Sequence, residues 1–287
     1  MAKIINGKEM AAQIRAEAAL EAAQFARRYG RAPGLAVIIV GSDPASQIYV
    51  RNKHKACAAC GISSQVIELP GDTGEKELLA RVAALNEDAQ TDGILVQLPL
   101  PEGIDKRKVI SAVAPAKDVD VFHSLNVGML TSGDYTLAPC TPSGVLEMLR
   151  RTGIVMEGRK CVMVGRSNLV GKPLALLMLE QNCTLTVCHS KTVDLKKECR
   201  QADILISAVG KPRLITGDMV KKGAVVIDIG INRLEDGSLC GDVDFEAAKK
   251  KASYITPVPG GVGPMTVAML MKNTVRAAFA AMEKKEK

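Results

Sequence analysis

The sequence predicts an α/β protein of two domains, each built on a parallel sheet. The chain has 287 residues, about twice a common domain length. Short apolar runs alternate with amphipathic stretches almost throughout, a pattern typical of parallel strands that are covered on both faces by helices. With 47% hydrophobic and 24% charged residues, the composition is that of a folded protein with a substantial core.

The first domain is predicted from one strand–helix alternation. Residues 35–40 form a continuous apolar run that ends at Gly41, and residues 44–60 are helical, with Asp43 as N-cap and Pro44 at the first position. The next predicted elements are a strand at 66–69, a helix at 75–85 and a strand at 93–97.

The alternation restarts after Pro139–Pro142, a breaker cluster that we interpret as a linker. Further strands are predicted at 161–164, 185–187, 204–206 and 225–227, and a helix at 173–179. Residues 256–266, with three Gly and three Pro, are expected to form a loop, and the amphipathic C-terminal stretch a helix that returns to the first domain. The predicted domains are residues 1–138 with the returning helix 266–287, and residues 139–265.

Composition excludes several classes of protein. The longest apolar runs have six residues, whereas a membrane span needs roughly 20, so no membrane association is expected. No secretory signal is recognisable, which favours a cytoplasmic location and free thiols for the eight cysteines. The net charge of +7 is spread along the chain, and Trp is absent, so an anionic small ligand is expected rather than nucleic acid. Cys57 and Cys60 have no second cysteine pair, and no metal site is predicted.

A glycine-rich turn, Gly165–Pro173, joins a predicted strand to a predicted helix. Such a turn binds phosphate through free N–H groups and the positive end of the helix dipole. It follows neither the G-x-G-x-x-G pattern nor the Walker pattern. A plain strand-to-helix turn is the alternative.

The second strand of this domain favours NADP over NAD. An NAD site usually has an acidic residue at the end of that strand, but here His189–Thr192 follows, without an acid. Arg166, Ser190 and Lys191 are instead suited to the 2′-phosphate of NADP. A solvated basic rim is the alternative.

Tyr49 and Lys53 place a phenol and an amine on one helical face, at positions i and i+4. Short-chain dehydrogenases share this spacing, but there the pair follows the dinucleotide turn, whereas here it precedes the turn by more than 100 residues. A surface Tyr–Lys pair is the alternative. Gln97 lies at the carboxyl end of a predicted strand, and α/β proteins bind their ligands at this end of the strands. Asp118 and Asp120 can accept hydrogen bonds from an amino-pyrimidine edge.

Taken together, the motifs resemble those of the bifunctional methylenetetrahydrofolate dehydrogenase/methenyltetrahydrofolate cyclohydrolase family. The similarity extends over essentially the whole chain, and the motifs occur in the family's order. They are Tyr49/Lys53, 96–101, 117–120, 139–142, 165–173, 189–192, 230–232 and 257–266.

The resemblance implies an α/β protein with a Rossmann-like NADP-binding domain, a folate substrate and a homodimer. It implies NADP-linked oxidation of 5,10-methylenetetrahydrofolate to the methenyl compound, then hydrolysis to 10-formyltetrahydrofolate, within one-carbon metabolism and purine biosynthesis. The implied catalytic residues are Lys53, Tyr49 and Gln97. The implied folate contacts are Asp120, Asp118, Pro259 and Gly260, and the implied NADP contacts are Gly165, Arg166, Ser167, Ser190, Ile231 and Thr141.

The two implied reactions, the oxidation and the hydrolysis, require different things of these residues. Hydride leaves a carbon flanked by two nitrogens, so the first step needs orientation rather than a strong base. The hydrolysis needs proton transfers, which Lys53 could perform with Gln97 tuning it. A dehydrogenase without hydrolysis and a non-catalytic NADP-sensing protein are the alternatives.

One position departs from the family pattern. The family usually has Gly after the second acid of the Lys-Asp-Val-Asp motif, whereas this chain has Val121. If that position requires φ > 0, a β-branched residue there is expected to be strained.

Overall fold

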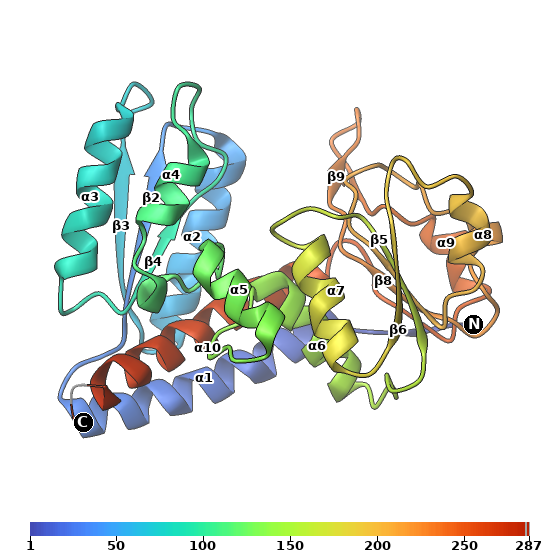
Figure 1. Cartoon of the computed structure of the whole chain (residues 1–287), viewed down its shortest axis with the longest axis horizontal. Coiled ribbons are helices and arrows are strands. Elements are labelled where there is room, and N and C mark those ends of the chain that lie inside the picture. Colours follow the sequence, from blue (N-terminus) through green and yellow to red (C-terminus); the bar gives the residue numbers. More distant parts are fainter. Residues whose placement is uncertain (285, 287) are drawn as a thin grey trace. The chain divides into compact units, whose positions relative to one another are not determined.

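The computed structural model describes residues 1–284 and 286 and divides the chain into two compact units (Figure 1). One, here called the three-stranded unit, comprises residues 12–140 and the C-terminal segment from Val267. The other, the six-stranded unit, comprises residues 1–11 and 141–266. Within the described residues, no helix combines the length and the apolar character that a membrane crossing requires.

The three-stranded unit is built around β2 (Gly34–Val40), every residue of which is buried. It lies between β3 (Ser63–Leu69) and β4 (Gly93–Val96), and both pairings are parallel. The continuous apolar sequence of β2 therefore fits its central position. The helical segments that follow or connect these strands in the three-stranded unit are α2 (Pro44–Ala59), α3 (Glu75–Glu87), α4 (Lys106–Ala112), η1 (Pro115–Lys117) and α5 (Ser124–Ser132).

Helix α2 begins where the sequence predicts. The carboxylate of Asp43 accepts a hydrogen bond from Ser46 N at 2.7 Å, and Pro44 occupies the first turn. This side-chain cap satisfies an N–H group that has no partner within the helix, and Pro has no N–H to lose there.

Two long helices, α1 (Gly7–Tyr29) and α10 (Val262–Glu283), pack side by side in the three-stranded unit (Figure 1). The rings of Phe25 and Phe279 meet edge to face, with centroids 5.2 Å apart and an interplanar angle of 88°. The C-terminal helix therefore returns to the N-terminal helix, which confirms the expected return.

The six-stranded unit contains one parallel sheet in the order β1-β11-β8-β7-β5-β6. Its strands are β1 (Lys3–Ile4), β5 (Lys160–Val164), β6 (Thr184–Cys188), β7 (Ile204–Ser207), β8 (Val225–Asp228) and β11 (Tyr254–Ile255). Its helical segments are α6 (Cys140–Arg151), α7 (Gly171–Glu180), α8 (Leu195–Cys199), η2 (Gly217–Met219) and α9 (Phe245–Lys249). A small antiparallel pair, β9 (Asn232–Arg233) and β10 (Leu239–Cys240), extends from it.

The arrangement of β5, β6 and β7 creates the opening expected of a Rossmann-like sheet. Strand β5 pairs with β6 on one side and with β7 on the other, so the chain changes direction across the sheet at β5. Loops that leave the carboxyl ends of such strands diverge and leave a crevice for a ligand. The predicted two-domain α/β fold is confirmed.

Three details differ from the sequence-based expectation. Strand β1 pairs with β11, so the first eleven residues group with the six-stranded unit and not with residues 12–138. The expected linker at 139–142 is already helical from Cys140, and the expected loop at 256–266 becomes helical at Val262. Both helices carry Pro in the first turn, where its missing N–H has no intrahelical partner to lose.

Candidate functional site

A lysine and a glutamine are joined at the carboxyl edge of the three-stranded sheet. Lys53, on α2, donates from Nζ to Gln97 Oε1 at 3.0 Å. Gln97 follows β4, and its own Nε2 donates to Leu98 O at 2.7 Å. Because α2 follows β2 and Gln97 follows the neighbouring β4, both lie where the chain switches direction across the sheet. Tyr49 lies one turn before Lys53 and is 45% exposed, so its ring is accessible to a ligand.

The two carboxylates of the predicted acidic motif have different environments. Asp118 is 5% exposed, and its Oδ2 accepts from His123 N at 2.8 Å and from Asn126 Nδ2 at 2.9 Å. Asp120 is partly exposed. Burial raises the pKa of Asp120 and outweighs the nearby charge of Lys53, which acts to lower it. Asp118 therefore supports the loop, whereas the carboxyl of Asp120 lies close enough to Lys53 to feel its charge.

Val121 has a left-handed backbone with φ of 60°, and its side chain is 1% exposed. Its N–H donates to Asp118 O at 3.2 Å and closes a tight turn around Asp120. A β-branched residue is disfavoured in this conformation. The strain considered from the sequence at this position is therefore present, directly beside the Asp120 carboxyl.

Two residues that sequence reasoning did not single out hold the same loop. Asn273, on α10, donates from Nδ2 to Val119 O and to Ala138 O, at 2.9 Å each. The buried Cys140 thiol donates to Val119 O at 3.4 Å, and burial raises its pKa, which keeps the thiol protonated. In the sequence Asn273 stands between Lys272 and Thr274, so no local signal marked it, and only the fold shows that this amide is buried and finds the partners that a buried amide needs.

In the six-stranded unit, the predicted phosphate turn follows β5. Gly165 has φ of 120°, and a Cβ there would lie 2.3 Å from Ala208 O. A Cβ on Gly171 would lie 2.5 Å from Gly165 O, so both positions require glycine. Ser167 Oγ accepts from the N–H groups of Val170 and Gly171 at 3.2 Å each, where the turn passes into α7. Ser167 thus shapes the turn.

The predicted phosphate-binding residues lie at one edge of the sheet. Val164 at the end of β5 is in register with Cys188 at the end of β6, so Arg166 and Ser190 follow neighbouring strand ends. The segment after β6 is a compact turn, in which His189 N donates to Thr192 Oγ1 at 2.9 Å and Lys191 N to His189 Nδ1 at 3.1 Å. Arg166 and Ser190 are both exposed. This glycine cradle beside a basic edge fits a dinucleotide with an additional phosphate.

A buried pair of carboxylates shapes the segment around Ile231, which is 48% exposed. Asp228 Oδ1, at the end of β8, accepts from Gly230 N at 3.0 Å. A Cβ on Gly230 would lie 2.2 Å from Asp242 Oδ1, so these acids fix the path of the chain before Ile231. Burial raises the pKa of Asp228 to about 6, although backbone N–H groups act to lower it.

Asp242 is fully buried and holds the loop that follows β7. Its carboxylate accepts from Val209 N at 2.7 Å, from Lys211 N at 2.9 Å and from Asn232 Nδ2 at 3.0 Å. Neither Asp228 nor Asp242 belongs to a motif that sequence reasoning used. Their role depends on the topology, which brings the ends of β7 and β8 together.

Three further predicted residues lie in the six-stranded unit. Gly260 has φ of 103°, and its carbonyl accepts from Lys8 N at 3.2 Å. Pro259 precedes it and follows a cis peptide bond. Thr141 Oγ1 lies 2.9 Å from Thr266 Oγ1, in hydrogen-bond contact. The structure thus groups Lys53, Gln97 and Asp120 in one unit and the predicted NADP contacts in the other. Among the residues that the structure describes, no cluster of three His, Cys, Asp or Glu could hold a metal ion.

Comparison with known proteins agrees with this division. The family model described as "Tetrahydrofolate dehydrogenase/cyclohydrolase, catalytic domain" matches residues 5–120, and the family's "NAD(P)-binding domain" model matches residues 139–282.

Full-length relatives agree as well. "Bifunctional protein FolD" of Moorella thermoacetica is 58% identical over 277 residues, which cover 96% of this chain and 99% of that protein. The crystal structure of the bifunctional enzyme FolD, methylenetetrahydrofolate dehydrogenase/cyclohydrolase, from Campylobacter jejuni matches with a TM-score of 0.95 and 48% identity, covering 98% of this chain and 100% of that one. The Trypanosoma brucei dehydrogenase-cyclohydrolase, solved with NADP cofactor and inhibitor, matches with a TM-score of 0.94 and 43% identity, covering 98% of each chain. The chain therefore belongs to the tetrahydrofolate dehydrogenase/cyclohydrolase family.

Proposed function

We propose that Lys53, Gln97, Tyr49 and Asp120 perform the folate chemistry of this enzyme, which is an NADP-dependent methylenetetrahydrofolate dehydrogenase and methenyltetrahydrofolate cyclohydrolase. It oxidises 5,10-methylenetetrahydrofolate to 5,10-methenyltetrahydrofolate and hydrolyses that product to 10-formyltetrahydrofolate. The observation that carries the residue assignment is the 3.0 Å contact between Lys53 Nζ and Gln97 Oε1, in the electrostatic field of Asp120.

We assign cofactor binding to the edge of the six-stranded sheet. Bound NADP⁺ supplies the hydride acceptor for the first step. Gly165 lets the backbone approach the cofactor closely, and Ser167 holds the turn in shape. Arg166 and Ser190 bind the 2′-phosphate, because a guanidinium and a hydroxyl at neighbouring strand ends suit a phosphate group. Ile231 and Thr141 complete the proposed contacts.

The oxidation step asks the protein mainly for orientation. The reacting carbon lies between two nitrogens whose lone pairs stabilise the cation that forms, so no strong base is needed. Tyr49 offers an exposed ring on which the pterin stacks, and Asp120 accepts hydrogen bonds from the pterin edge. Both residues lie close to Lys53 in the chain's fold, so they fix the reacting carbon relative to it.

The hydrolysis step moves protons. Water adds to the cationic carbon and loses a proton, which gives a neutral tetrahedral adduct. As the bond from this carbon to the leaving ring nitrogen breaks, the nitrogen gains a proton and the hydroxyl of the adduct loses one to become the formyl carbonyl, so one proton is released overall. Lys53 Nζ performs these transfers. Gln97 accepts one Lys53 N–H while its own amide is fixed on Leu98 O, so Nζ is held in one direction.

We propose fewer folate contacts than the resemblance implies. Both hydrogen bonds to Asp118 Oδ2 come from the protein itself, so we assign this carboxylate to holding the loop. The proposed folate contacts are Asp120, Pro259 and Gly260. We further propose a homodimer that works in the cytoplasm, supplies purine biosynthesis and binds no nucleic acid. The family resemblance and the dispersed basic residues support these assignments.

Substitution of Lys53 tests the proposed roles. Lys53→Met is expected to abolish the hydrolysis of 5,10-methenyltetrahydrofolate while NADP⁺ binding, measured by calorimetry, stays within about twofold of the unsubstituted enzyme. Lys55→Met is the matched control, because Lys55 is an exposed lysine on the same helix. Loss of NADP⁺ binding in Lys53→Met, or equal loss of hydrolysis in Lys55→Met, would contradict the assignment.

A further inference from the structure

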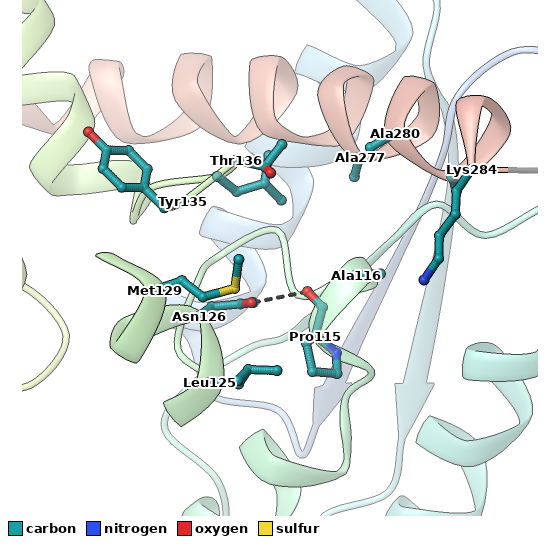
Figure 2. A pocket seen from close by; sticks show the side chains of 12 residues that line it. Pro115, Ala116, Leu125, Asn126, Met129, Tyr135, Thr136, Ala277, Ala280 and Lys284 are labelled. Carbon is teal, nitrogen blue, oxygen red and sulfur yellow. Dashed lines mark hydrogen bonds between the residues drawn. The ribbon is translucent and has the colours of Figure 1, made fainter. Parts of the chain in front are cut away.

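We propose that the three-stranded unit carries a second small-molecule site, which binds a medium-chain monocarboxylate between α5 and α10 (Figure 2). The structure contains a cavity of about 400 Å³ there, within the range of roughly 300–1,000 Å³ that small-molecule pockets occupy. Its walls come from η1, α5, residues 135–137 and the last turns of α10. Lys53, Gln97 and Asp120 are not among its lining residues, so the proposal does not depend on the proposed function.

The walls of this cavity are mainly apolar. Helix α10 presents Ala277, Ala280 and Ala281, whose short side chains leave the space open. Leu125 and Met129 from α5 line the opposite wall, and Leu125 is 55% exposed although it is a large apolar side chain. The free energy falls when an apolar group covers apolar surface that lines a hollow open to water. An aliphatic chain is such a group.

One end of the cavity is cationic. Lys284 lies at the end of the α10 wall, and Figure 2 shows its amino group turned toward Ala116. By contrast, the two N–H groups of Asn126 are used by the protein, since Nδ2 donates to Pro115 O and to Asp118 Oδ2, at 2.9 Å each. Among the residues that the structure describes, Lys284 is the one charged side chain that lines the cavity. An apolar wall that ends at a cation matches a ligand with an apolar body and one negative charge.

Hydrogen bonds tie each side of the cavity to a neighbouring segment. Asn126 ties α5 to η1 through Pro115 O (Figure 2). Asn273 ties α10 to the carbonyl of Ala138, next to the wall residue Leu137. A cavity whose walls are linked in this way does not have to be ordered by the ligand, which lowers the entropic cost of binding.

Titration with sodium octanoate tests the proposal. With the methionine methyl groups ¹³C-labelled, the Met129 resonance is expected to shift and to saturate, which gives a Kd. Hexanoate and decanoate extend the series, and each added methylene is expected to tighten binding about three- to fourfold. Octanol, which lacks the charge, is expected to bind at least fivefold more weakly. Turnover of the folate substrate serves as the check that each variant is folded.

Two variants and their controls separate the apolar and the cationic contributions. Ala280→Trp fills the cavity and is expected to abolish binding, whereas Arg276→Trp, at an exposed position of the same helix, is expected to leave it unchanged. Lys284→Glu is expected to weaken octanoate at least fivefold, with the exposed Lys250→Glu as control. Absence of a saturable shift would overturn the proposal. Unchanged binding in Ala280→Trp would overturn the location, and unchanged binding in Lys284→Glu would overturn the monocarboxylate assignment.

Discussion

The side-chain amide of Asn273 donates to the backbone carbonyl of Val119 at 2.9 Å, although the two residues are 154 positions apart. The same amide donates to Ala138 O, so one residue of the C-terminal helix satisfies two carbonyls around the Asp120 loop. The returning helix is thus part of the support of the candidate site as well as of the core.

Asn273→Ala is expected to lower the free energy of unfolding by about 2 kcal/mol, because a buried and a partly buried carbonyl each lose an amide donor. The KM for the folate substrate is expected to rise as the Asp120 loop loosens. Urea unfolding and steady-state kinetics measure the two effects. Arg276→Ala, exposed on the same helix, is the control and is expected to change stability by less than about 0.5 kcal/mol. An equal loss in both variants would show that the amide has no special role.

Gln97→Glu is expected to change the pH dependence of the hydrolysis. A carboxylate in place of the Gln97 amide, 3.0 Å from Lys53 Nζ, favours the protonated amine. The limb of the pH–rate profile that reports Lys53 is therefore expected to move to higher pH. The exposed Gln65→Glu, on β3, adds the same charge away from Lys53 and is expected to leave the profile unchanged. A profile unaffected by Gln97→Glu would rule out the tuning role of Gln97.

The variant Val121→Gly is expected to be more stable to unfolding than Val121→Ala by about 1 kcal/mol, because the left-handed backbone disfavours any residue with a Cβ. The same two substitutions at Val119 serve as the control. Both variants lose most of the buried valine side chain, so their difference isolates the backbone. Val119 is also buried but lacks a positive φ, and there Ala is expected to be the more stable. Urea midpoints of the four variants test this. The same order at both positions would show that Val121 is unstrained.

The carboxyl of Asp228 is expected to titrate near pH 6 in the folded protein, since burial raises its pKa to about 6. In the unfolded chain an aspartate titrates near ~4, so the folded state binds more protons between about pH 4 and 6. The contribution of Asp228 to stability is therefore greatest below pH 4 and falls as the pH rises through this window. Carboxyl ¹³C NMR measures the midpoint. Asp236 is the internal control, because its hydrogen bonds with Ser238 lower its pKa. A midpoint below 4 for Asp228 would contradict the expectation.

Arg166→Ala is expected to raise the KM for NADP⁺ at least tenfold and to leave the KM for NAD⁺ within about twofold, because the lost guanidinium contacts the 2′-phosphate. Lys172→Ala removes a positive charge from an exposed position of α7 and controls for the general potential. Parallel losses for both cofactors in Arg166→Ala would place this residue on the shared part of the dinucleotide.

Much of the fold is predictable because its strands are continuous apolar runs. Residues 35–40 and 161–164 match β2 and β5 to within a residue at each end. Helix α1 was not predicted, since its buried positions are largely alanines, such as Ala11, Ala18 and Ala22, and alanine gives little contrast between the two faces of a helix.

The site was predictable only as far as local motifs reach. The spacing of Tyr49 and Lys53 places both on one face of α2, and the contact with Gln97 follows from the adjacent strands. The same motif contains Asp118 and Asp120, and the sequence cannot separate their roles because the donors to Asp118 come from α5. Asp242 was missed because two of its partners, Val209 and Lys211, lie about 30 positions away and meet it only in the folded sheet.

The central claim is that this chain catalyses both folate reactions with NADP⁺. Purified protein mixed with 5,10-methylenetetrahydrofolate and either NADP⁺ or NAD⁺ tests it directly, with the absorbances of reduced nicotinamide and methenyltetrahydrofolate followed together. The expected result is that reduced cofactor forms without accumulation of the methenyl compound, and faster with NADP⁺. Accumulation of methenyltetrahydrofolate that decays only at its spontaneous rate would contradict the hydrolase activity, and no turnover with either cofactor would contradict the whole assignment.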